Sequence, residues 1–351
     1  MTWKRRIGSI LIDLCIACLI LLGVWILNYK LPHRMAAEIK QPLPQQSDQT
    51  EIQIPYVEEP GPEAIAEGSS TAQTGNFKEK FADQFTDQVV ETADSYTSPD
   101  LAIHISHQSY DSGRLDTTDQ RHVKYGTKIA YTVADIYVSD ISCLKTAFAR
   151  DTYGIGYEEK LTAMAKRLGS KLAVNGDSYS NDHNKEKGTV IRNGVYYRVG
   201  QSDAETCVLN QDGTMDIYAP GTVDRQTLEE KGAYQSWVFG PSLLDDNGKA
   251  KSEFVTWDYI RQSHPRTAIG YYEPGHYCLV QVDGRQSSTR GMFLEEMAKL
   301  FETLGCQKAY NLDGGHCSFM VRDTTVENHP YKPEHGVADG IFIMEQGGTD
   351  L

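Results

Sequence analysis

The sequence has no excess of positive charge. Its 34 Lys and Arg residues are outnumbered by 48 Asp and Glu residues, which gives a formal net charge of −14 at pH 7. Proteins that bind nucleic acid mainly neutralise its phosphates with Lys and Arg, so this balance argues against nucleic acid as the main partner. Small basic pockets that hold a single phosphate are still compatible with it.

Cysteine is also sparse, and its number does not suit a disulfide framework. Two of the seven cysteines, Cys15 and Cys18, lie within an apolar run near the N-terminus, and five lie beyond it. An odd number of thiols cannot pair completely, so free cysteines are expected in the remainder of the chain.

Histidine and cysteine spacings typical of metal sites are missing as well. The histidines of the N-terminal and central parts, His104, His107, His183 and His264, fit no standard zinc ligand set. We therefore expect no cofactor; the ligand spacing does not indicate a divalent cation, although it leaves one open. No repeat of fixed period is visible either.

One long hydrophobic run stands out, at residues 7–27. It is long enough for a transmembrane helix, and the basic residues before it, Lys4, Arg5 and Arg6, favour a cytoplasmic tail at residues 1–6. We therefore predict a single-pass cell-membrane protein whose residues beyond the run are extracytoplasmic. A cleaved signal peptide is the alternative, but the run is longer than a usual signal core and no clear cleavage site follows it.

The next two segments differ in composition from the rest. Residues 28–75 are rich in Pro, Gln, Glu, Gly and Ser, which predicts a disordered stalk. Residues 76–97 are expected to hold an amphipathic helix and a linker, because Asn76 can cap a helix whose apolar residues recur every four positions, at Phe77, Phe81, Phe85 and Val89.

Residues 98–351 show the pattern of a folded domain. Short apolar, partly alternating segments bounded by Gly, Asp or Asn predict many strands. Residues 158–169 and 291–305 have apolar residues at helical spacing and end in Gly, and each leads into a strand. The predicted fold class is therefore α/β or α+β, with a mixed β-sheet core and packed helices.

Polar clusters follow several of these strands. They are Asn175-Gly176-Asp177, Asp283-Gly284-Arg285 and the stretch 311–315, which reads Asn-Leu-Asp-Gly-Gly. A single Asx-Gly pair is ordinary turn chemistry. Three such clusters after buried strands, together with Arg266, indicate a ligand site built at strand ends.

These clusters belong to an ordered series of motifs. In chain order they read AVNGDSYS, VIRNGVYYR, FGPSLLDDNGK, HPRTAIG, QVDGR, GMFLEEMAKLFETLG, NLDGGHCSFM and VADGIFI. The series resembles the phosphodiester glycosidase family over about residues 135–344. That family includes the lysosomal uncovering enzyme, which removes N-acetylglucosamine from mannose 6-phosphate, and bacterial relatives labelled exopolysaccharide biosynthesis proteins.

The resemblance implies hydrolysis of a sugar-1-phosphodiester, here expected in a cell-surface polysaccharide or glycopolymer. The carboxylates that match the family and are candidates for catalysis are Asp177, Asp313 and Glu296. The candidates for substrate binding are Asn175, Arg266, Thr267, Asp283, Arg285, Asn311, Gly314, Gly315 and Ser318. Among these, Arg266 and Arg285 suit a phosphate clamp, because a guanidinium group can contact two phosphate oxygens.

The chain departs from the family where Gly-Ser-Ser-Thr-Met is common, since it has His316, Cys317, Ser318, Phe319 and Met320. Two alternatives therefore stay open. The protein could be a non-catalytic exopolysaccharide-binding or assembly protein on the same fold. It could also be a metal-dependent phosphodiesterase that uses Asp177, Asp313 and His316 as ligands. The sequence leaves the oligomeric state open.

Overall fold

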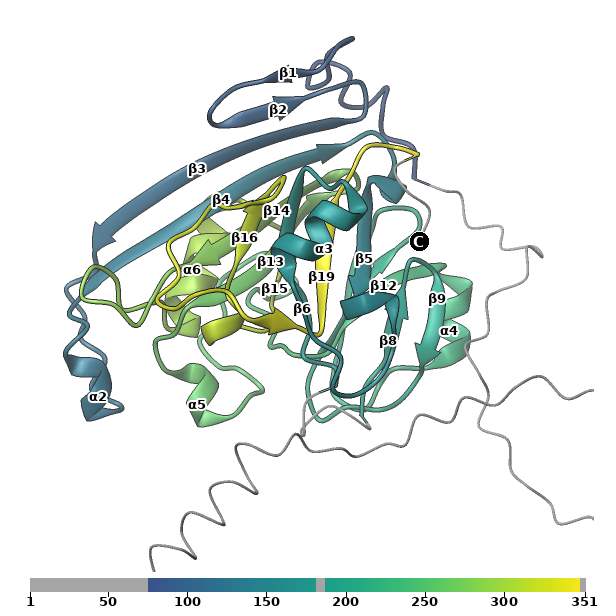
Figure 1. Cartoon of the computed structure of the whole chain (residues 1–351). Coiled ribbons are helices and arrows are strands. Elements are labelled where there is room, and N and C mark those ends of the chain that lie inside the picture. The colour runs from purple at the N-terminus through teal and green to yellow at the C-terminus, as the bar shows by residue number, and fades with distance from the viewer. Residues whose placement is uncertain (1–74, 181–186, 348–351) are drawn as a thin grey trace, which may run out of the picture. The chain divides into compact units, whose positions relative to one another are not determined.

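The computed structural model describes residues 75–180 and 187–347, which lie within one compact unit at 59–351. Most of its elements are strands (Figure 1). The largest sheet has seven strands in the order β1 (Val90–Glu91), β2 (Ser95–Thr97), β3 (Leu101–Asp111), β4 (Lys128–Val138), β14 (His276–Val282), β13 (Arg266–Glu273) and β15 (Lys308–Asn311).

The second sheet has five strands in the order β17 (Thr325–Val326), β16 (Met320–Arg322), β7 (Leu172–Asn175), β19 (Asp339–Ile343) and β5 (Leu144–Phe148). A three-stranded sheet has the order β11 (Met215–Tyr218), β10 (Thr206–Asn210) and β12 (Ala233–Trp237). Two strand pairs complete the β-structure: β18 (Gly336–Val337) with β6 (Glu159–Lys160), and β8 (Val190–Arg192) with β9 (Val195–Arg198).

The helices of the described residues are short. They are α2 (Gln120–Val123), α3 (Leu161–Leu168), α4 (Arg225–Glu230), α5 (Asp258–Arg261) and α6 (Leu294–Leu304), with 3-10 turns η2 (Ile141–Cys143), η3 (Ala149–Asp151) and η4 (Gly315–Cys317). The longest two, α3 and α6, are the helices predicted from the sequence. Each ends at a glycine in the left-handed region, Gly169 or Gly305, as the sequence indicated.

The predicted fold class is wrong, because the described residues are mostly β and their named strand pairings are all antiparallel. The sheets are therefore not mixed. The order strand, helix, strand suggested parallel neighbours, and β14 and β15 do run in the same direction on either side of α6. They are not neighbours, however, since β13 pairs antiparallel with both and lies between them.

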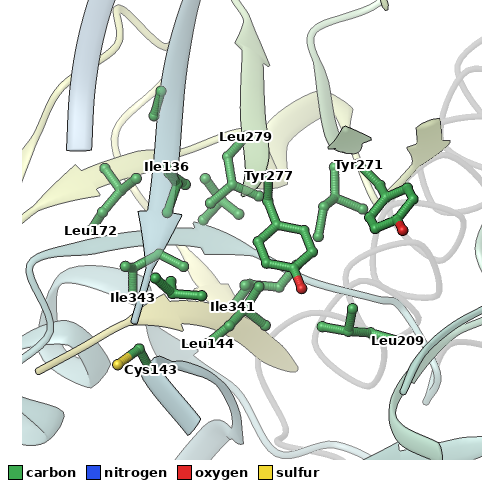
Figure 2. Packing of buried hydrophobic residues seen from close by; sticks show 14 of the residues in the cluster. Ile136, Cys143, Leu144, Leu172, Leu209, Tyr271, Tyr277, Leu279, Ile341 and Ile343 are labelled. Atoms are coloured by element: carbon green, nitrogen blue, oxygen red, sulfur yellow. The ribbon is translucent and has the colours of Figure 1, made fainter. Parts of the chain in front are cut away.

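Two sheets pack face to face, with a helix on each outer face. Side chains alternate along the strands: Ile269 and Leu279 point into the core between the sheets, whereas Ala268 and Val280 point toward α6. In the second sheet Ile341 faces the same core and Phe342 faces α3. Figure 2 shows this central packing, in which Ile136, Tyr277 and Leu279 lie above Leu144, Ile341 and Ile343.

The N-terminal predictions have different outcomes. Residues 78–84 form successive turns, not the expected helix, although Phe77 and Phe81 are buried on the body as its apolar spacing suggested. The run at 7–27 lies outside the described residues, as does the stalk as far as residue 74. In the part that the structure describes, no helix has both the length and the apolar character to cross a membrane. The predicted single-pass membrane location is therefore not supported, and we do not retain it.

The packing between the sheets yields a stability prediction. Ile341 is completely buried, whereas Ile155 is 63% exposed. Ile341→Ala leaves a cavity between the sheets and should lower the free energy of unfolding by about 2–5 kcal/mol. The matched change Ile155→Ala should alter it by less than about 0.5 kcal/mol. Urea unfolding of the full chain measures both; equal effects would contradict this account of the core.

Candidate active site

The predicted polar clusters converge because the strands are antiparallel. The start of β13 lies beside the end of β14, with Arg266 opposite Val282, and near the end of β15, with Ala268 opposite Asn311. The residues that follow β14 and β15 therefore reach the same edge of the sheet as Arg266. In the second sheet the end of β7 lies beside the start of β19, since Asn175 is opposite Gly340.

The Asn175 side chain joins these two edges. Its amide nitrogen donates to the main-chain oxygen of Asp313 at 2.6 Å. Its amide oxygen accepts hydrogen bonds from the Thr267 hydroxyl at 2.6 Å and from the main-chain nitrogen of Phe319 at 3.3 Å. The Asp313 nitrogen also donates to the Gly176 oxygen at 3.2 Å. The clusters after β7 and β15 are thus held together across the two sheets.

A cavity of about 480 Å³ opens beside this junction. Predicted site residues from two of the clusters, together with Arg266 and several aromatic side chains, line it. The complete lining is Phe239, Trp257, Tyr259, Ile260, His264, Pro265, Arg266, Arg285, Leu312, Asp313, Gly314, Gly315 and His316. A second cavity of about 380 Å³ adjoins it and shares Phe239, Trp257 and Ile260.

Asp313 is the predicted catalytic carboxylate that lines the main cavity. Desolvation raises its pKa to about 6, although hydrogen bonds from the Cys317 thiol and the Gly314 nitrogen oppose the rise. The backbone after Asp313 passes very close to β13, because a Cβ atom at Gly314 would lie 2.8 Å from the Pro265 oxygen. Only glycine fits there, which explains why the Asp-Gly-Gly sequence marks this site.

Asp177 lies outside the residues that line the cavity and is nearly fully buried. Its Oδ2 accepts a hydrogen bond from the Val238 nitrogen at 2.7 Å, whereas its Oδ1 has no partner among the described residues. Burial, followed by the nearby carboxyl of Asp339, raises the pKa of Asp177 to about 7. Asp339 forms a buried ion pair with Arg192 and accepts a hydrogen bond from the Asp177 nitrogen.

The Arg285 guanidinium is held at the cavity by three neighbours. It donates to the Tyr331 hydroxyl at 2.8 Å and to the Tyr259 hydroxyl at 3.0 Å, and its Nη2 lies 3.3 Å from Nδ1 of His264. His264 is neutral, because burial and the charge of Arg266 lower its pKa to about 3. Its Nε2 donates to the main-chain oxygen of Tyr259 at 2.7 Å. The lone pair of Nδ1 is therefore left to accept a hydrogen bond from Arg285.

Arg266 is bound mainly by the main chain. Its Nε donates to the Met292 oxygen at 2.7 Å, and its Nη2 donates to the oxygens of Ile260 and Gln262, both at 2.6 Å. Its Nη1 lies 3.5 Å from the Asn311 side-chain oxygen. The side chain is 3% exposed, so this guanidinium reaches the cavity wall with most of its donors already used.

The structure separates the remaining predicted residues from the cavity. Glu296 forms an ion pair with the buried Arg290 and accepts from the Phe293 nitrogen, which caps α6. Asp283 accepts hydrogen bonds from the Asn328 side chain and the His329 nitrogen. Ser318 is buried, and its hydroxyl has no partner in the described chain. The contacts of Glu296 and Asp283 are thus with the protein's own groups, away from the cavity lining.

Sequence reasoning missed several residues at the cavity. Phe239 belongs to the FGPSLLDDNGK motif, which was recognised although no residue was selected from it. Trp257 and Tyr259 come from the polar stretch around α5. Asp339, at the start of β19 in the VADGIFI motif, was missed as well. It does not line the cavity but contacts Asp177, and its Asp-Gly pair after an apolar residue was the signal that could have identified it. Among the described residues, no group of three His, Cys, Asp or Glu side chains is placed to hold a metal ion.

Comparisons with known proteins agree with the motif series. A family model described as phosphodiester glycosidase matches residues 169–344. The SPbeta prophage-derived uncharacterized protein YomE of Bacillus subtilis (strain 168) is 35% identical over 193 residues, 54% of this chain and 29% of that protein. Mouse N-acetylglucosamine-1-phosphodiester alpha-N-acetylglucosaminidase is 25% identical over 177 residues, 46% of this chain and 34% of that protein. The chain thus spans about a third of the length of these curated relatives.

The fold is similar to two solved structures. The catalytic domain of zebrafish N-acetylglucosamine-1-phosphodiester alpha-N-acetylglucosaminidase matches with a TM-score of 0.54 and 20% identity, over 71% of this chain and 90% of that one. A hypothetical protein from Synechocystis matches with a TM-score of 0.50 and 12% identity, over 70% of this chain and 62% of that one. These likenesses concern the fold alone, whereas the family resemblance seen in the motifs is confirmed by the family model.

The buried Asp177 yields a prediction about pH. Its pKa is 3.8 in the unfolded chain and about 7 in the folded one, so the folded state binds more protons between these values. The free energy of unfolding should therefore fall as the pH rises from about 4 to 7. Asp177→Asn removes this contribution and should stabilise the protein near pH 8 by about 1–4 kcal/mol.

Urea unfolding at about pH 5 and about pH 8 measures this difference. The control is Asp246→Asn at an exposed position, which should keep the wild-type slope. A slope in Asp177→Asn that equals that of the wild type would show that Asp177 is not the group responsible.

Proposed function

Because the chain belongs to the phosphodiester glycosidase family, we propose that it hydrolyses a sugar-1-phosphodiester between the anomeric carbon and the phosphate oxygen. The products are the free sugar and a phosphate monoester. The observation that carries this proposal is that one cavity presents both the Asp313 carboxyl and the Arg285 guanidinium, one suited to the sugar carbon and the other to the phosphate.

The leaving group sets what the site must supply. A phosphate monoester has a second pKa of about 6, so it departs from carbon without the strong protonation that a sugar alkoxide needs. A cation that binds the phosphate oxygens is then enough to stabilise the departing charge. One carboxylate that acts on water can complete the reaction.

We assign the phosphate contact to Arg285. Its two terminal nitrogens are fixed by tyrosine hydroxyls and by the neutral His264, and its fork therefore keeps one orientation. Neutral His264 accepts a hydrogen bond and adds no second charge that would repel Arg285. Arg266, whose donors are taken by main-chain oxygens, instead holds the loop around α5 against β13.

We assign the role of general base to Asp313. A base works best when its pKa lies near the working pH, and a value of about 6 leaves most of this carboxyl ionised at neutral pH. It then takes a proton from the water that attacks the anomeric carbon. Activity should fall as the pH drops below about 6, because Asp313 becomes protonated.

The cavity mouth supports a carbohydrate chain as the wider substrate. Trp257 is 51% exposed and Tyr259 is 53% exposed, and exposed aromatic rings beside a cavity suit the apolar faces of sugars. The adjoining cavity shares Trp257 with the main one and gives room for groups beyond the diester. We propose a cell-surface glycopolymer as the source of the linkage.

The two arginines allow a matched test. Arg285→Lys keeps the charge but loses the two-pronged contact, so kcat/KM for a sugar-1-phosphodiester should fall about 10- to 100-fold, as for the loss of a charge-assisted hydrogen bond worth about 1.5–3 kcal/mol. Its unfolding should stay near that of the wild type. Arg266→Lys should instead lower the free energy of unfolding, because it leaves buried carbonyl oxygens unsatisfied. The opposite pattern would exchange the two roles.

Hydrolysis in ¹⁸O-labelled water decides which bond breaks. Attack at the anomeric carbon places the label on the sugar hydroxyl, which is the expected result. Asp313→Asn should lower kcat by about 100-fold or more, since Asn cannot accept the proton. Mass spectrometry of both products and steady-state kinetics give these readouts.

Other outcomes of this experiment favour the alternatives. Label in the phosphate, with activity lost on treatment with a chelator, would mean attack at phosphorus by a metal-dependent phosphodiesterase. A folded wild-type protein that is inactive on every sugar-1-phosphodiester tried would favour a carbohydrate-binding protein on this fold.

A further inference from the structure

Three side chains form a continuous series of contacts that begins at the cavity. The Cys317 thiol, at the end of η4, is hydrogen-bonded to the Asp313 carboxyl. On its other side, the Cys317 sulfur lies 3.6 Å from Nε2 of His335. The series therefore reads carboxyl, thiol, imidazole, and each group can both give and receive a proton.

Asp313 lines the cavity, whereas Cys317 and His335 do not. Both Cys317 and His335 are partly exposed, so the series connects the cavity with solvent outside it. Asp313 also faces the cavity, but a bound substrate or product blocks that side during turnover. Cys317 and His335 are not among the residues that line this cavity, so they offer a route that bound substrate does not close.

We propose that Cys317 and His335 form a proton relay that carries away the proton which Asp313 takes from the attacking water. This inference rests on the proposed function, because it gives the base of that reaction a way to return to its ionised form. Asp313 is the catalytic residue, whereas Cys317 and His335 act through it.

The relay balances as two linked proton transfers. During hydrolysis, the water O–H bond breaks, the new bond from oxygen to the anomeric carbon forms, and the bond from carbon to the phosphate oxygen breaks. The water proton is then on Asp313. It moves to the Cys317 sulfur as the thiol proton moves to Nε2 of His335, which releases a proton to solvent.

The chemistry of the two relay groups fits these steps. Burial and the nearby carboxyl of Asp313 raise the pKa of Cys317 well above its usual range, so it stays a thiol and does not act as a nucleophile. Burial and the neighbouring His316 lower the pKa of His335, which favours release of its proton. The His316 ring lies 4.1 Å from the His335 ring and donates through Nε2 to the Pro333 oxygen.

Other charged groups also face the relay and contribute to its titration. Asp177 and Asp339 act on or near Asp313, Glu158 and Arg285 act on Cys317, and Glu158 and Glu334 act on His335. None of these groups is changed in the variants below, so their effects cancel in the comparison.

The first test follows the ionisation of Asp313 without using activity. Carboxyl ¹³C NMR of the full chain, with the Asp313 signal assigned through Asp313→Asn, gives its titration midpoint. Cys317→Ala removes a donor to the ionised carboxylate, so the midpoint should rise above its wild-type value near 6. Cys317→Ser keeps a donor and should titrate close to the wild type.

The second test measures the relay in turnover. Cys317→Ala and His335→Gln should each lower kcat by about 10- to 100-fold, the scale of assisted proton transfer, with KM little changed. Imidazole added to His335→Gln should restore part of kcat, because the lost group lies near solvent. His104→Gln, at an exposed position on β3, is the matched control and should keep wild-type kinetics.

Each outcome bears on the relay separately from the hydrolase activity. Equal midpoints for Asp313 in Cys317→Ala and the wild type would overturn it, as would equal shifts in Cys317→Ala and Cys317→Ser. A wild-type kcat in His335→Gln would also overturn it. If the midpoint shifts only in Cys317→Ala but no sugar-1-phosphodiester is cleaved, the contact is real and the proposed function fails.

Discussion

The buried amide of Asn175 is the contact on which the arrangement of the site depends. It holds the main chain at Asp313, in one sheet, against the end of β7, in the other, and it also bonds Thr267 at the start of β13. Both of its polar atoms are used, so the amide must keep this orientation. This amide therefore fixes the position of the Asp313 carboxyl at the cavity relative to the two packed sheets.

Buried charge outside the cavity lining is the second constraint. Arg192 and Asp339 neutralise each other, whereas Asp177 shares their surroundings without a cation of its own. A raised pKa is what burial of an extra carboxyl produces. The same desolvation acts on Asp313, so the features that lower stability at this edge also give a carboxyl suited to proton transfer near neutral pH.

The sequence predicted individual elements better than it predicted their arrangement. The many short strands of the folded domain, and both longer helices, are visible in local patterns because alternation and helical spacing are local properties. That β13 would lie between β14 and β15 depends on contacts distant in the sequence. Asp313 and Arg285 were selected from their Asx-Gly and family motifs, and both line the cavity. Glu296 matched as well, but its ion pair with Arg290 occupies it, and only three-dimensional contacts reveal this.

The residues that the family model matches are not the whole unit that must fold together. The long strands β3 and β4 lie before the matched residues but belong to the same sheet. The family match begins at residue 169, yet β14 pairs along its whole length with β4, which ends at Val138. A gene fusion or recombination event that carried only the matched segment would leave β14 as an open sheet edge with apolar side chains on both faces. Such edges recruit other chains. The matched segment can therefore be inherited as a stable unit only together with the strands that precede it.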